Sequence, residues 1–141
     1  MPINFFTEDS SFTLKNKRKL KSWIQDTVQL ENCKTGEINY IFTSDKYLLN
    51  INKQYLSHNY YTDIITFNYC ENKVINGDIY ISIDTVKNNS TRFAVTFNEE
   101  LNRVMIHGVL HLLGYDDHNE KEKLQMREKE NYYLERLKNL S

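Results

Sequence analysis

Two histidines four positions apart are the strongest chemical signal in the sequence. His107 and His111 stand in the stretch His107-Gly-Val-Leu-His-Leu-Leu-Gly-Tyr-Asp-Asp-His118. On an α-helix, side chains at i and i+4 lie on one face, so two neutral imidazole nitrogens can reach one zinc ion at about 2.0–2.1 Å. The alternative is a pair of unrelated histidines on an apolar helix. Three of the four histidines of the chain fall in this stretch, and this concentration favours the metal.

A third ligand is expected just after the helix. Gly114 can adopt the left-handed conformation that ends a helix, and the turn that follows can bring His118 back to the same ion. We expect His118 rather than Asp117 to be this ligand, because an aspartate is shorter and because three histidines give an all-nitrogen set. Asp116 or Asp117 would then orient a ligand as a hydrogen-bond acceptor. Three protein ligands with an open fourth position are typical of catalytic zinc, so we predict one Zn²⁺ per chain.

The residue after the first histidine separates two kinds of zinc chemistry. Zinc proteases of the H-E-x-x-H class carry a glutamate there as general base, whereas this chain has Gly108. Ordinary metalloprotease chemistry is therefore disfavoured.

The metal motif and two further blocks resemble the YbeY family of bacterial endoribonucleases. The family signature H-G-x-L-H-L-x-G-Y-D-H is matched from His107 through Asp116. The family block P-T-D-V-L-S-F is matched by Tyr61-Thr-Asp-Ile-Ile-Thr-Phe67, and its G-D-I strand start by Gly77-Asp78-Ile79. The blocks occur in the family order between about residues 50 and 130, which makes the resemblance specific.

The resemblance implies a function. It implies a single-strand-specific, metal-dependent endoribonuclease that acts in 16S rRNA 3′-end maturation and late ribosome quality control. The implied partners are ribosomal RNA and the small ribosomal subunit, with neither DNA nor a membrane. The implied fold is zincin-like, with the metal ligands on a central helix.

Three positions depart from the family pattern. The third histidine of the family falls on Asp117, and His118 is one residue later. An arginine that commonly follows a tyrosine in the family aligns with Leu56, so its catalytic role does not carry over. Tyr61 replaces a proline, which changes loop stiffness because proline fixes φ.

His58 is our candidate for the missing catalytic group. It stands two residues after Leu56, and an imidazole can donate to a phosphate or move a proton near neutral pH. The alternative is a histidine in a surface loop. Asp63 belongs to the matched Thr-Asp pair, but a carboxylate before a strand is as often a turn or cap residue.

Composition limits the class of protein. With 141 residues, 40% of them hydrophobic, the chain is the size of one domain, which we place at residues 1–141. Cys33 and Cys70 form no C-x-x-C motif, and the N-terminus lacks a basic start followed by an apolar run. No apolar run approaches the roughly 20 residues that cross a bilayer. Reduced thiols and a cytoplasmic location fit best.

The net charge of the chain argues against binding of nucleic acid through an overall positive charge. The formal net charge is −1, whereas nucleic-acid binders usually carry a basic balance or a basic face. The concentrated basic patch consists of Lys15, Lys17, Arg18, Lys19 and Lys21. It is either a solvated helix face or, if RNA is the substrate, a place of phosphate contact.

Hydrophobic periodicity and capping signals predict the elements that carry the motif. We expect helices over about 14–30, after Ser44, over 84–93, from Thr96 to Leu113 and from Asn119 onwards. Strands are expected over 3–6, from Gly36, over 64–67 and over 79–83, with Asn76-Gly77 as the turn of an antiparallel pair. Thr96 with Glu99, and Asn119 with Glu122, have the spacing of capping boxes. The predicted fold is α+β, a small mixed β-sheet covered by helices around a central metal-bearing helix.

Two other functions fit the same residues. The protein could be a ribosome-assembly binding factor with a structural metal, which the missing arginine favours. It could also be a metal-dependent hydrolase of another substrate, which Gly108 disfavours.

Overall fold

The computed structural model describes residues 3–58 and 62–140. Tyr61, the replacement for the family proline, lies outside this range. The elements follow the order β1 (Ile3–Glu8), α1 (Lys17–Leu30), β2 (Lys34–Thr43), α2 (Asp45–Leu56), β3 (Ile64–Asn68), β4 (Val74–Ser82), α3 (Ile83–Arg92), α4 (Phe97–Leu112) and α5 (Glu120–Lys138).

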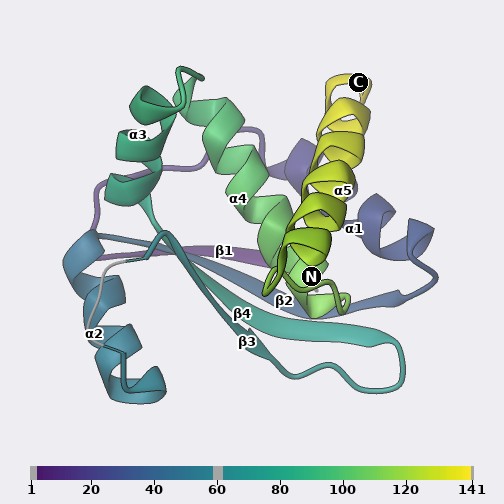
Figure 1. Cartoon of the computed structure of the whole chain (residues 1–141), viewed down its shortest axis with the longest axis horizontal. Helices are drawn as coiled ribbons and strands as arrows, with labels where there is room; N and C mark the ends of the chain where they lie inside the picture. Colours follow the sequence, from purple (N-terminus) through teal and green to yellow (C-terminus); the bar gives the residue numbers. More distant parts are fainter. Residues whose placement is uncertain (1–2, 59–61, 141) are drawn as a thin grey trace.

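The strands form one mixed sheet in the order β1-β2-β4-β3. β1 and β4 both pair with β2 in parallel, and β3 pairs with β4 antiparallel. Helices α1, α3, α4 and α5 cover one face, while α2 lies at the other face near β3 and β4 (Figure 1). The predicted α+β architecture with a small mixed sheet is confirmed.

The core lies between the sheet and α4. Tyr40, Phe42, Ile79 and Ile81 alternate along β2 and β4 and are fully buried. Helix α4 packs on this face with nearly all of its apolar residues buried, and the Tyr40 hydroxyl donates to its backbone. Because a buried helix of this kind cannot tilt without opening the core, α4 is a rigid support for side chains at its edge.

Helix ends follow the expected capping chemistry. The Thr96 side chain accepts from Glu99 N–H while the Glu99 carboxylate accepts from Thr96 N–H, so the predicted capping box is confirmed. The Asn119 side chain caps α5 by accepting from Glu122 N–H, but the Glu122 carboxylate accepts from the backbone of His118 instead of closing the box. Helix α1 begins at Lys17, three residues later than predicted.

The predicted turn at Asn76-Gly77 is wrong. Both residues lie inside β4, and Gly77 pairs with Asn68 of β3. A Cβ on Gly77 would stand 2.6 Å from the Phe67 carbonyl oxygen, so this glycine serves a close backbone approach. The hairpin turns at Asn72 and Lys73, where both φ values are positive, as in the two-residue turns that match the strand twist.

Candidate metal centre and its groove

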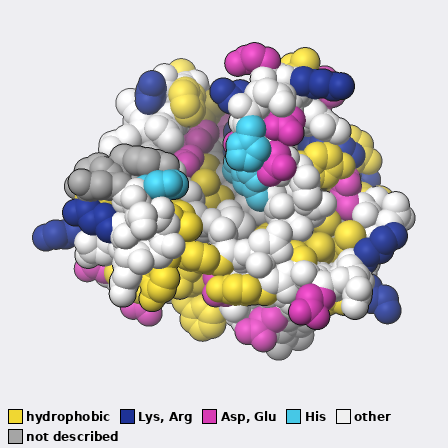
Figure 2. Space-filling view, turned by 60° about the horizontal axis from the view of Figure 1, so that its bottom comes forward, with side chains coloured by type: hydrophobic (Ala, Val, Ile, Leu, Met, Phe, Trp, Pro, Cys, Tyr) yellow, Lys and Arg dark blue, Asp and Glu magenta, His cyan; other side chains and the backbone are white. Residues whose placement is uncertain are grey.

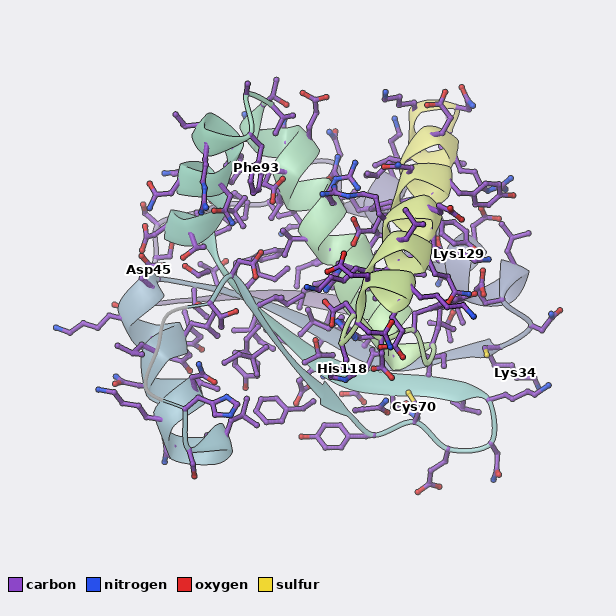
Figure 3. All side chains as sticks on the ribbon, in the orientation of Figure 1. Lys34, Asp45, Cys70, Phe93, His118 and Lys129 are labelled. Atoms are coloured by element: carbon purple, nitrogen blue, oxygen red, sulfur yellow. The ribbon has the colours of Figure 1, made fainter. Side chains whose placement is uncertain are left out.

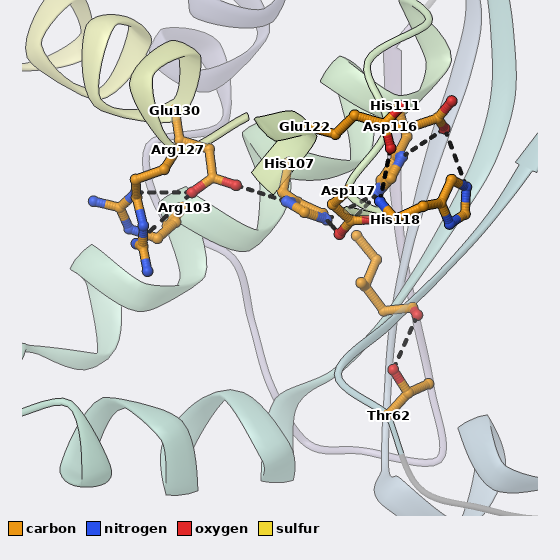
Figure 4. A network of polar contacts seen from close by, with 11 residues as sticks. Thr62, Arg103, His107, His111, Asp116, Asp117, His118, Glu122, Arg127 and Glu130 are labelled. Atoms are coloured by element: carbon orange, nitrogen blue, oxygen red, sulfur yellow. Dashed lines mark hydrogen bonds and ion pairs between the residues drawn. The ribbon is translucent and has the colours of Figure 1, made fainter. Parts of the chain in front are cut away.

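The two histidines lie on one face of α4 at its C-terminal end. Their Nε2 atoms are 2.9 Å apart, and each imidazole is partly exposed at the edge of the core. The i, i+4 spacing therefore brings the two nitrogens together as expected. Figure 4 shows the two rings facing a common point beside the turn that follows the helix.

The turn after α4 brings a carboxylate to the same point. Gly114, with φ of 105°, donates to the His111 carbonyl, and Tyr115 N–H reaches back to the Leu110 carbonyl. This is the tight reversal typical of a glycine-ended helix. It sets Asp117 Oδ2 at 3.4 Å from His107 Nε2 and 3.7 Å from His111 Nε2.

The donor set fits a transition metal. One ligand atom from each of His107, His111 and Asp117 lies within 4.8 Å of the others. Ligands at about 2.0–2.1 Å from a tetrahedral zinc ion stand about 3.3 Å apart, and the three separations of 2.9, 3.4 and 3.7 Å lie around that value. Two imidazole nitrogens with one carboxylate oxygen form a donor set that catalytic zinc uses, with a fourth position for water or substrate.

His118, which we expected to be the third ligand, is placed elsewhere. Its side chain is 79% exposed and lies 3.8 Å from Asp116 Oδ1, and it is not part of the convergent group. The backbone explains the difference. The reversal at Gly114 brings the chain so close to α4 that the short aspartate reaches the histidines, and the Glu122 carboxylate holds the His118 backbone at the start of α5.

Glu130 contacts the candidate site, and the sequence reasoning missed it. It lies on α5, is only 5% exposed, and its Oε2 accepts from His107 Nδ1–H at 2.6 Å. Its other oxygen accepts from Arg103 at 2.8 Å, and Arg103 also donates to Asn131. An ionised carboxylate can only accept, so this contact places the proton on Nδ1 and leaves the Nε2 lone pair of His107 for a metal. No sequence spacing links Glu130 to the histidines.

The charges at the site shift the pKa values of the two histidines in opposite directions. Burial alone would lower the pKa of His107, but the hydrogen bond to Glu130 and the charges of Glu130 and Asp117 outweigh it and raise that pKa. The pKa of His111 is lowered by burial and by its neighbour His107. The lowered pKa of His111 favours its neutral form, which is the form that binds a metal.

Packing explains why position 108 is a glycine. A Cβ there would lie 2.9 Å from Ile79 Cγ2 and 3.1 Å from Ile64 Cδ1. Helix α4 therefore rests directly on the sheet at the position where H-E-x-x-H proteases carry a glutamate. There is no room for such a side chain between helix and sheet.

Leu56 and His58 line a groove on one side of the metal centre. This groove, of about 370 Å³, also includes His111, Asn52 and Thr62. The structure thus brings the candidate His58 and the position of the family arginine to the same groove as a metal-site histidine. Figure 2 shows histidine side chains on both sides of a hollow in this face of the molecule.

Asp63 does not line the groove that contains Leu56 and His58. It lines a second groove, of about 330 Å³, together with His107 and Asp117. Burial raises the pKa of the Asp63 carboxyl, and the charge of His107 only partly offsets this. Asp63 is not part of the convergent ligand group.

Comparisons with known proteins agree with this geometry. A family model described as "Endoribonuclease YbeY" matches residues 3–138. The chain belongs to the YbeY endoribonuclease family. It is 46% identical over 134 residues to the endoribonuclease YbeY of Parabacteroides distasonis, covering 95% of this chain and 94% of that protein. It is 49% identical over 132 residues to the one of Karelsulcia muelleri, covering 94% and 93%.

A solved structure supports the fold of this YbeY family member. The solution structure of TM1509 from Thermotoga maritima superimposes with a TM-score of 0.69 at 32% sequence identity. The match covers 96% of this chain and 88% of that one. No helix within the described residues combines the length and apolar character that a membrane span requires.

Proposed function

We propose that this chain is a single-strand-specific, metal-dependent endoribonuclease that acts in 16S rRNA 3′-end maturation and in late ribosome quality control. Membership of the endoribonuclease family supports RNA as the substrate. The observation that carries the metal dependence is the convergence of His107, His111 and Asp117 at the end of α4. In this proposal residues 1–141 work as one domain, with the small ribosomal subunit as partner in the cytoplasm, where its rRNA matures.

We propose Asp117 as the third ligand of a single zinc ion, in place of His118. The chemistry that such an ion supplies is Lewis acidity towards a phosphodiester oxygen and towards a water molecule. His107 and His111 hold it from the rigid helix, and Glu130 keeps the proton on His107 Nδ1. Gly108 lets the helix that carries both histidines rest directly on the sheet.

His58 is the proposed second catalytic group. It lines the same groove as His111, so a phosphate at the metal centre has an imidazole on its α2 side. There His58 would donate a proton to the phosphate or to the leaving oxygen. Leu56 cannot take this role because it has no polar atom.

The test is cleavage of a circular single-stranded RNA by purified protein, with and without chelator. A circle has no ends, so only an endonuclease opens it. We expect opening in the presence of zinc, none with chelator, and strongly reduced opening with Asp117→Ala. A matched RNA duplex and an unstructured peptide are the controls for substrate class.

Each other outcome has a definite consequence. If the circle stays closed under metal-replete conditions while the protein binds RNA, the chain is a ribosome-assembly binding factor and the proposal fails. Cleavage of the peptide instead would identify a hydrolase of another substrate. Normal 16S rRNA 3′ ends in a strain without the protein would contradict the role in maturation.

A further inference from the structure

Two unlike grooves meet at the metal centre. The first, lined by Leu56, His58 and His111, we call the neutral arm. The second is the groove that includes His107 and Asp117. Ile64, at the start of β3, lines both grooves, so they adjoin, and each includes residues of the candidate ligand group.

The second groove continues away from the metal. It shares Phe93, Glu100, Arg103 and Arg127 with a larger groove of about 1020 Å³ between the segment before α1, the start of α4 and the end of α5. We call the two together the cationic arm. Phe93, at the corner between α3 and α4 (Figure 3), marks the place where they join.

The two arms differ in charge. Among the described residues that line the neutral arm there is no Lys, Arg, Asp or Glu. The cationic arm is lined by lysines and arginines from three elements and the segment before α1: Lys15, Lys19, Arg103, Lys123, Arg127 and Lys138.

Six carboxylates of the described part of the chain also line the cationic arm, but most are engaged or buried: Asp63, Glu99, Glu100, Asp117, Glu130 and Glu135. Glu130 is 5% and Glu100 6% exposed, and Glu99 is used in the cap of α4. The cations are more accessible: the side chains of Lys123 and Arg127 are 59% and 60% exposed. Glu135 lies 3.9 Å from Lys138, and Asp117 belongs to the candidate ligand group. Beside the metal centre, Lys123 and Arg127 are therefore the charged side chains most accessible to a ligand.

The cations next to the metal centre are only weakly paired. Arg127 lies 3.9 Å from Glu130 Oε1, an oxygen that already accepts from Arg103 at 2.8 Å. Lys123 lies 4.0 Å from Glu120, whose side chain is 97% exposed. The exposed Lys123 pair contributes little, and Arg127 shares an oxygen that a closer arginine already occupies. A phosphate can therefore displace both contacts.

We propose, on the basis of the function above, that the RNA strand is gripped by its phosphates on one side of the cleaved bond only. The cationic arm binds the backbone, with Arg127 and Lys123 nearest the reacting phosphate. Phe93, 55% exposed, offers a ring on which a base stacks. The neutral arm contacts the strand through amides, hydroxyls and His58.

Lys21 of the basic patch lies over the Phe5 ring, and the structure divides the other four residues of the patch into two pairs. Lys15 and Lys19 line the cationic arm, whereas Lys17 and Arg18 do not line either arm. Both pairs carry the same charge and neither has an ion pair within the described part of the chain. They are therefore matched probes of the path of the strand.

The main experiment measures binding of a labelled single-stranded RNA over a range of salt concentrations. Both pairs are neutralised, as Lys15→Gln with Lys19→Gln and as Lys17→Gln with Arg18→Gln, in an Asp117→Ala background that limits cleavage. Loss of two phosphate contacts should weaken binding about tenfold and flatten the slope of log K against log salt by about 1.4. The second pair should change both quantities much less.

Two further variants separate charge from stacking. Phe93→Ala should weaken binding with an unchanged salt slope, because stacking releases no counterions, and Phe6→Ala, a similarly exposed aromatic outside both arms, is its control. Arg127→Gln in the otherwise unchanged enzyme should lower kcat/KM about tenfold or more, whereas Lys121→Gln on the same helix should not.

The outcomes distinguish this inference from the proposed function. Suppose that the wild-type protein cuts RNA but the two double substitutions weaken binding equally, or neither weakens it. The assignment of the cationic arm is then overturned, while the proposed endoribonuclease function is retained. If the wild-type protein cuts no RNA with metal present, the proposed function fails whatever the binding shows.

Discussion

The candidate metal centre joins two regions of opposite character. Helix α4 contributes His107 and His111 from a backbone that is buried along most of its length. The turn from Gly114 to His118 contributes Asp117 and is held by contacts to distant parts of the chain. The Tyr115 hydroxyl donates to Glu31 at 2.7 Å, and Glu31 also accepts from Lys129 and Tyr133. A ligand on a packed helix is fixed locally, while one on a turn depends on tertiary anchors.

The largest effect is expected on the helix side. His107→Ala and His111→Ala should each abolish metal binding, because two remaining ligands cannot hold the ion against water. Elemental analysis of protein purified without chelator measures this directly, and circular dichroism checks the fold. Unchanged metal content in both variants would mean that the helix pair is not the metal centre.

The turn side is tested by two neighbouring residues. Asp117→Ala should lower metal affinity by more than about a hundredfold, since it removes a ligand rather than a supporting group. His118→Ala should leave affinity unchanged, because that side chain is 79% exposed and lies outside the convergent group. Zinc titration with a competing chelator gives both constants. The reverse pattern would restore His118 as the ligand.

Glu130, on α5, supports the ligands of α4 through its hydrogen bond to His107. Glu130→Gln keeps the shape but sets an amide N–H against either His107 or Arg103, so metal affinity should fall about 10- to 100-fold. Glu128→Gln, exposed on the same helix, is the matched control. Loss of stability without loss of metal affinity would contradict the positioning role.

The smallest effect is expected at the anchor of the turn. Burial alone would raise the pKa of Glu31, but hydrogen bonds from Tyr133, Tyr115 and Lys129 lower it. A carboxyl with a lowered pKa stabilises the fold above its unfolded pKa and loses this contribution as the pH falls through the folded pKa. Glu31→Gln should therefore cost about 1.5–3 kcal/mol at neutral pH, and the difference should shrink in acid.

Urea unfolding of Glu31→Gln at neutral and acid pH measures this contribution. Glu120→Gln, with a side chain 97% exposed, should show no such pH-dependent difference. If Glu31→Gln were as stable as the wild type at neutral pH, the turn would be held by the glycine-ended helix alone.

The sequence by itself determined the helix half of the centre. His107 and His111 are one helical turn apart, and the capping box at Thr96 and Glu99 predicts where that helix begins. These are local relations, set by the geometry of a single element, and the α+β arrangement of the sheet and helices followed from similar periodicities. The predicted turn at Asn76-Gly77 was wrong because Gly77 serves the close approach of β4 to the backbone of β3.

Only the tertiary structure decided the rest. Whether Asp117 or His118 meets the histidines depends on how closely the chain returns after Gly114, and the anchors of that return come from Glu31 and from the start of α5. Glu130 reaches His107 only because α5 packs against α4. Likewise, Lys15 and Lys19 are distinguished from Lys17 and Arg18 by the walls of a groove built from several elements. Contacts between residues far apart in the chain cannot be predicted from sequence spacing, because the packing of the elements determines them.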